Sequence, residues 1–162
     1  MMQTSEPSSD AVFNSFDVMF AQMMVPHHEQ AIEMADAMLE KDAIDPRVID
    51  LDEQVKAAQQ PEIDQLDEWL DEWGADPAPT GAMSRGSVMM SDTDVAAPDT
   101  ATGAEASRVF LEQMTVHHEV AITMAQSEID GGANPDAIEL AQAIVDAQTE
   151  EITLMRDILD SL

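Results

Sequence analysis

The feature that most constrains the fold is an internal repeat. The segment FAQMMVPHHEQAIEMA at residues 20–35 returns 90 positions later as FLEQMTVHHEVAITMA at residues 110–125. A second segment, residues 51–70, returns 89 positions later at residues 140–159, with a Glu-Ile pair and both terminal leucines in place. Two copies at a nearly constant offset indicate two similar structural units, which pack on one another to complete a core.

Each repeat has the pattern of a helical hairpin. Apolar residues recur every three to four positions, as on one face of an α-helix, and no segment alternates like a strand. The second and fourth helices are expected to begin at Asp45-Pro46 and Asn134-Pro135, each a capping side chain followed by proline. The predicted helices cover residues 9–41, 46–73, 105–129 and 135–162.

The segment between the hairpins is rich in Pro, Gly, Ser, Thr and Asp, and it is long enough to run the length of a helix. Two hairpins joined by one long crossover predict an all-α, ferritin-like four-helix bundle, whose first and third helices are antiparallel neighbours. That packing would bring both histidine pairs to one level of the bundle. We expect a single domain over residues 1–162, with hairpin repeats at 9–73 and 105–162 and a crossover at 74–104.

Composition limits what such a bundle can do. The chain has no cysteine, so a bound metal must be held by histidine, methionine or carboxylate. With 34 acidic and 6 basic residues the net charge is −28, which disfavours nucleic acid as a partner. No apolar run is long enough for a membrane span. No phosphate loop, nucleotide fingerprint or nucleophile with an adjacent base is present, so we do not expect an enzyme.

The repeated motif resembles a known family. HHExAIxMA with a methionine three residues before the first histidine, followed by a QxxEI helix, is similar to the ferritin-like family catalogued as domain of unknown function 305. The resemblance covers nearly the whole chain. An aspartate usual in the family is present as Asp17 but is Ser107 in the second copy. The matching positions are Met24, His27, His28, Ala31, Met34 and Ala35, then Met114, His117, His118, Ala121, Met124 and Ala125.

The resemblance implies a copper-associated protein. Members are typically exported bacterial proteins, and some bind copper or silver through histidine and methionine. The implied location is therefore periplasmic or extracellular, with an export signal already removed, since this chain does not open on one. Copper is the implied metal, and a copper donor or acceptor protein is the implied partner.

The side chains fit that chemistry. Cu(I) prefers thioether and imidazole donors, and Met24 and His28 lie four residues apart on one helical face. The family's crossover usually carries a cluster of methionine and glycine, of which Met83, Met89 and Met90 are a sparse version. The candidate metal-binding residues are His27, His28, His117, His118, Met24, Met114, Met34, Met124, Glu62 and Glu151.

The two glutamates are included because buried imidazoles need hydrogen-bond partners. Glu62 and Glu151 hold equivalent positions on the second and fourth helices. Each is expected either to orient a ligand histidine or to bind a harder ion such as Zn(II) or Fe(II). Gln59 and Gln148 lie one turn earlier and are expected in the same network.

Two other functions compete with copper binding. A di-iron or di-manganese oxidase would need paired Glu-x-x-His motifs, but methionine, valine or threonine stands three residues before each histidine. A metal-free bundle, acting as a structural or partner-binding module, would use the histidines as a polar core network. We predict a protein that binds Cu(I), with Cu(II) or silver as alternatives, for sequestration or delivery.

Overall fold

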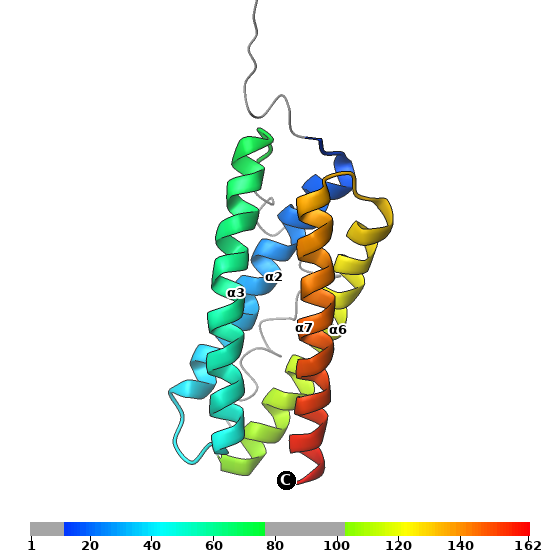
Figure 1. The fold of residues 1–162 in the computed structure, drawn as a ribbon. Coiled ribbons are helices and arrows are strands. Elements are labelled where there is room, and N and C mark those ends of the chain that lie inside the picture. Colours follow the sequence, from blue (N-terminus) through cyan, green and yellow to red (C-terminus); the bar gives the residue numbers. More distant parts are fainter. Residues whose placement is uncertain (1–11, 77–102) are drawn as a thin grey trace, which may run out of the picture.

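The computed structural model describes residues 12–76 and 103–162, which contain four α-helices. They are α2 (Ser15–Leu39), α3 (Pro46–Glu72), α6 (Gly103–Gly131) and α7 (Pro135–Asp160) (Figure 1). The predicted ends of the last three helices are right to within two residues. The predicted start of the first, at residue 9, is wrong because the Asn14 side chain caps the helix by accepting hydrogen bonds from the amides of Phe16 and Asp17.

The helices form an all-α bundle of two hairpins, as predicted. α2 packs along α3 and α6 along α7, and the hairpins meet chiefly through α2 and α6, which run antiparallel (Figure 1). α3 ends and α6 begins at opposite ends of the bundle, which is the connectivity of a ferritin-like bundle. Most of the predicted crossover, with Met83, Met89 and Met90, lies outside the described residues. In the described ranges no helix is long and apolar enough to cross a membrane.

The starts of α3 and α7 confirm the predicted capping. The carboxylate of Asp45 accepts a hydrogen bond from the Arg47 amide at 2.9 Å, and the side chain of Asn134 accepts one from the Ala137 amide at 2.9 Å. In each helix a proline takes the first helical position, where its missing N–H would have had no partner within the helix. The starts of the two helices are therefore built alike, as the repeat predicts.

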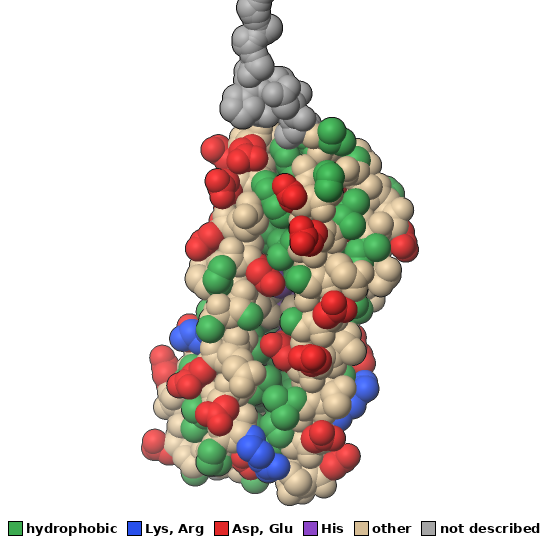
Figure 2. Space-filling model, in the orientation of Figure 1, with side chains coloured by type: hydrophobic (Ala, Val, Ile, Leu, Met, Phe, Trp, Pro, Cys, Tyr) green, Lys and Arg blue, Asp and Glu red, His purple; other side chains and the backbone are tan. Residues whose placement is uncertain are grey.

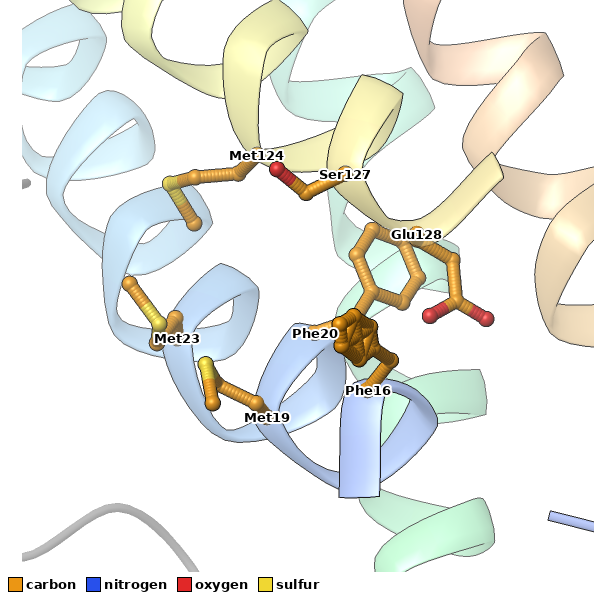
Figure 3. A pocket seen from close by; sticks show the side chains of 7 residues that line it. All are labelled: Phe16, Met19, Phe20, Met23, Met124, Ser127 and Glu128. Atoms are coloured by element: carbon orange, nitrogen blue, oxygen red, sulfur yellow. The ribbon is translucent and has the colours of Figure 1, made fainter. Parts of the chain in front are cut away.

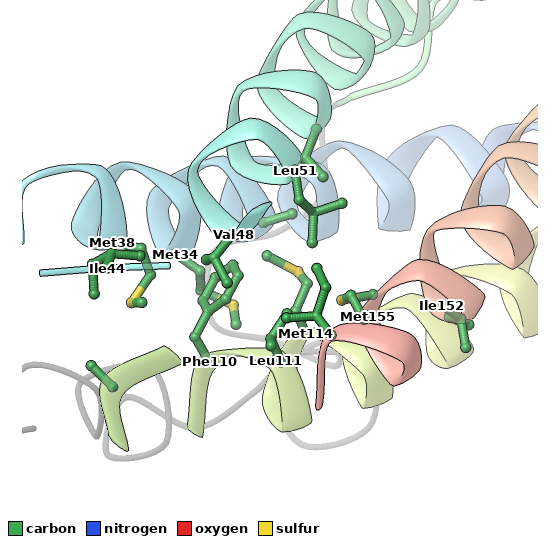
Figure 4. Close-up of a cluster of buried hydrophobic side chains, with 14 residues drawn as sticks. Met34, Met38, Ile44, Val48, Leu51, Phe110, Leu111, Met114, Ile152 and Met155 are labelled. Atoms are coloured by element: carbon green, nitrogen blue, oxygen red, sulfur yellow. The ribbon is translucent and has the colours of Figure 1, made fainter. Parts of the chain in front are cut away.

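The apolar core has two parts. One surrounds Leu51 and Phe110 near the end of the bundle where α3 and α6 begin (Figure 4). The other surrounds Phe20, Leu66 and Trp69 toward the opposite end. Along each helix the predicted histidine and glutamate ligands fall between the two clusters. They are His27, His28, Glu62, His117, His118 and Glu151. The bundle thus holds a polar layer with hydrophobic packing on both sides.

One buried carboxylate joins the two hairpins at the end of the bundle. Asp17 of α2 is fully buried and accepts hydrogen bonds from the amides of Ala133 and Asn134 in the α6–α7 turn, at 3.0 and 3.2 Å. It also accepts one from the Asn14 amide at 2.7 Å. Gly132 is needed beside it, because a Cβ there would stand 2.8 Å from Asp17 and 2.4 Å from a Glu128 oxygen.

The carboxyl groups of Glu128 and Asp17 lie side by side at Gly132. Burial, the hydrogen bond to Asp17 and the repulsion from its charge raise the pKa of Glu128 to about 9. Burial alone would raise the pKa of Asp17, but hydrogen bonds from Glu128 and three backbone amides outweigh it and lower that pKa. Glu128 is therefore protonated at neutral pH and donates to the Asp17 carboxylate.

We expect Glu128→Gln to flatten the pH dependence of stability, because glutamine donates the same hydrogen bond without a proton to lose. The pKa of Glu128 is about 9 in the folded chain, above its ordinary value of 4.5, so its contribution to stability is complete below pH 4.5 and is lost as pH rises toward 9. The stability of the variant relative to the wild type should grow steadily between pH 5 and pH 9, by up to about 1.4 kcal/mol for each unit of pH. Urea unfolding of both proteins at pH 5 and pH 9 measures this change. A stability difference that is the same at both pH values would contradict a protonated Glu128 in the folded chain.

Candidate metal centre

Two histidines are each held by a glutamate of the same hairpin. The Nε2 atom of His28 lies 2.7 Å from Oε1 of Glu62, and Nε2 of His118 lies 2.6 Å from Oε1 of Glu151. Both imidazoles are buried, whereas the carboxylates keep 20% and 14% of their side-chain surface exposed. In each pair the carboxylate oxygen accepts a hydrogen bond from Nε2–H. The remaining ring nitrogen, Nδ1, has no hydrogen-bond partner in either histidine. The expected contact between these glutamates and histidines is confirmed.

The other two histidines meet across the interface between hairpins. The rings of His27 on α2 and His117 on α6 are stacked, with centroids 3.6 Å apart and planes inclined by 21°. Burial, followed by the nearby imidazoles, lowers the pKa of His27 well below its usual value and lowers the pKa of His117 to about 3. Both rings are therefore neutral at physiological pH, with lone pairs that a soft metal ion can use.

A glutamine that the sequence analysis missed completes this arrangement. The Nε2 atom of His117 donates to Oε1 of Gln30 at 3.0 Å, whereas Nε2 of the buried His27 has no hydrogen-bond partner. Gln30 lies one helical turn after His27, which is the only signal that the sequence offers. The repeat gives no indication of Gln30, because the equivalent residue in the second copy is Val120.

The four candidate methionines lie on both sides of the polar layer. Met24 and Met124 belong to the apolar cluster around Phe20, and Met34 and Met114 belong to the cluster around Phe110. All four side chains are buried. Each histidine pair therefore has thioethers above and below it along the bundle, contributed by both hairpins.

Gln59 and Gln148 do not join the hydrogen-bond network of the histidines and glutamates as predicted. The Oε1 atoms of Gln59 and Gln148 are buried without a hydrogen-bond partner, so the extension of the network to these side chains is not observed. Within the described ranges no three His, Asp or Glu side chains are grouped so that they could hold a metal ion together.

The surroundings of the centre are acidic. In Figure 2 carboxylate side chains are spread along the whole visible face, and a trace of histidine is seen between the helices at mid-height. The net charge of −28 raises the local concentration of cations around the bundle. The acidic surface thus attracts metal ions without selecting among them, and selection falls to the donor atoms inside.

A family model and several solved structures match the chain. The model is described as domain of unknown function (DUF305) and matches residues 17–159. A DUF305 fragment from Deinococcus radiodurans is 31% identical over 92% of this chain and 98% of its own, with a TM-score of 0.83. A candidate secreted DUF305 protein from Streptomyces coelicolor is 29% identical over 91% and 92%, with a TM-score of 0.82.

CopM is a further match, with structures in Cu(II)-, Cu(I)- and Ag-bound forms. The Cu(II)-bound form is 30% identical over 90% of this chain and 96% of its own, with a TM-score of 0.78. No curated protein matches this chain.

Proposed function

Because this chain belongs to the DUF305 family, we propose that it binds copper as Cu(I), with Cu(II) or silver as alternative ions, and sequesters or delivers it. The observation that carries the proposal is the pair of buried, neutral imidazoles of His27 and His117 at the contact of the two hairpins. The copper- and silver-bound forms of CopM support the choice of metal.

The donor atoms suit a soft ion. His27 has an unpaired Nε2, and His28 and His118 each have an unpaired Nδ1. Thioethers of Met24 and Met114 are buried along the same helices. Imidazole and thioether are neutral ligands that favour Cu(I), whereas harder ions favour carboxylate and water. The stacked rings present their faces to one another, so binding requires them to turn within the layer.

The glutamates have a supporting role in this proposal. A carboxylate that accepts a hydrogen bond from Nε2–H of a histidine fixes its tautomer and makes the other ring nitrogen a better ligand. Glu62 and Glu151 are placed to do so for His28 and His118. We assign no catalytic step to the centre, and we place the protein outside the cytoplasm with a copper donor or acceptor as its partner.

A metal-free bundle is the competing function, and specific contacts favour it. The bonds of His28 to Glu62, of His118 to Glu151 and of His117 to Gln30 satisfy one nitrogen of each ring without any ion. The two functions therefore differ in one measurable property, which is stoichiometric binding of copper.

The test is a titration of the full chain with Cu(I) in competition with a chromogenic Cu(I) chelator. We expect a stoichiometric end point and a dissociation constant below micromolar, unchanged when potassium sulfate is added. Salt screens ions held only by the acidic coat, so weak binding that disappears with salt would overturn the proposal and leave the metal-free bundle. Addition of Zn(II) in excess should not displace the copper, because the donors are soft.

A further inference from the structure

A pocket near the start of α2 is lined by three methionines, two of which have no methionine at the equivalent position of the other repeat. Met19 and Met23 come from α2 and Met124 comes from α6, and the pocket has a volume of about 240 Å³. Figure 3 shows the Met19 and Met23 side chains along α2 and Met124 reaching from α6 toward the same space. The rings of Phe16 and Phe20 close another side.

Packing alone gives a weak account of these methionines. Met19 is 49% exposed, so it gains little from burial, and Met23 is only partly buried against the cluster around Phe20. A thioether is a flexible and polarizable donor, and three of them around one apolar pocket form a ligand set that hydrated hard cations do not use.

The internal repeat supplies a comparison within the molecule. The positions that correspond to Met19 and Met23 in the second copy are Val109 and Gln113. Of the three methionines only Met124 has a methionine counterpart in the other repeat, which is Met34 of the first copy. The second copy thus folds into the same helix without these two thioethers, so the helical hairpin does not require them.

Two of the pocket methionines lie on the same helical face as a histidine of the buried centre. Met19, Met23 and His27 follow one another at steps of four residues, and residues four apart are neighbours along one face of a helix. Met19 lies at the surface, whereas His27 is buried with a free Nε2. A soft ion held at the pocket would therefore be one to two helical turns from the imidazole layer.

We infer that Met19, Met23 and Met124 form an outer thioether site, which takes up Cu(I) or Ag(I) from solution and passes it to the histidines. Transfer is an exchange of neutral ligands, in which imidazole nitrogens replace thioether sulfurs and the charge of the ion does not change. The role in transfer rests on the proposed function, whereas the binding of a soft ion in the pocket does not.

The experiment uses silver nitrate as the probe and the full chain labelled with ¹³C at the methionine methyl groups. We expect the methyl signals of Met19, Met23 and Met124 to shift together on binding of Ag(I) to the wild type. Met19→Val with Met23→Gln gives α2 the residues of the second copy. This variant should bind one equivalent of silver fewer, and its Met124 methyl signal should no longer respond.

A matched control removes two thioethers elsewhere. Met38 and Met155 are buried in the cluster around Phe110, and their replacement by leucine should leave the silver stoichiometry and the pocket signals unchanged. If the variant with Met19→Val and Met23→Gln instead binds as many equivalents of silver as the wild type and shows the same Met124 shift, the outer site is overturned while the proposed function stands. If the wild type does not bind Cu(I) stoichiometrically but the methyl signals of its three pocket methionines still shift with Ag(I), the pocket site stands and the proposed function fails.

Discussion

Replacing His27 and His117 together with leucine is expected to lower the affinity for Cu(I) by at least about 100-fold, the upper range for loss of a residue that only supports a ligand. The two rings are the imidazoles that both hairpins bring to their shared interface. Leucine has a similar volume and no donor atom, so the variant removes the ligands without leaving a large cavity. The chelator competition of the wild type, repeated on the variant, measures the loss.

The matched control is Gln59→Leu with Gln148→Leu. These glutamines are also buried, one in each hairpin, and their Oε1 atoms have no hydrogen-bond partner. Two leucines placed there test the effect of an altered polar layer while all four histidines remain, and the Cu(I) affinity should stay within about threefold. Circular dichroism verifies that both variants are helical. An equal affinity in the histidine variant and the wild type would show that copper, if bound, is held elsewhere.

Asp17→Ala is expected to destabilise the bundle by about 3 kcal/mol, because it removes the acceptor of several buried hydrogen bonds at once. The amides of Ala133 and Asn134 would lose their partner, and Glu128 would lose the carboxylate that accepts its hydrogen bond. For a chain of this length the midpoint of thermal unfolding should fall by roughly 6–12 °C.

Ser107→Ala is the matched control, since Ser107 is the counterpart of Asp17 in the second repeat and is equally buried. Its hydroxyl has no hydrogen-bond partner, so its removal should change the stability by less than about 0.5 kcal/mol. Similar losses for both variants would mean that burial at this position matters and that the hydrogen bonds of Asp17 do not.

The repeat was sufficient to predict the fold. A duplicated amphipathic hairpin must bury its apolar face against its copy, which explains why the four helices and the antiparallel contact of α2 and α6 were predicted correctly. It also predicted the contacts of Glu62 and Glu151 with histidines, because a polar residue kept at one position in both copies, beside a buried isoleucine, needs a partner. The start of the first helix was missed because the cap at Asn14 has no equivalent in the repeat.

What the sequence by itself determined is therefore what both copies share: the helices, their pairing and the level at which the histidines lie. Only the tertiary structure decided which side chains touch across the two hairpins. The stacking of His27 on His117, the contact of Gln30 with His117 and the pocket between α2 and α6 depend on how far one helix is shifted and rotated against the other. The periodicity of a single helix carries no information on that shift, because it defines a face and leaves the partner of each residue on that face open.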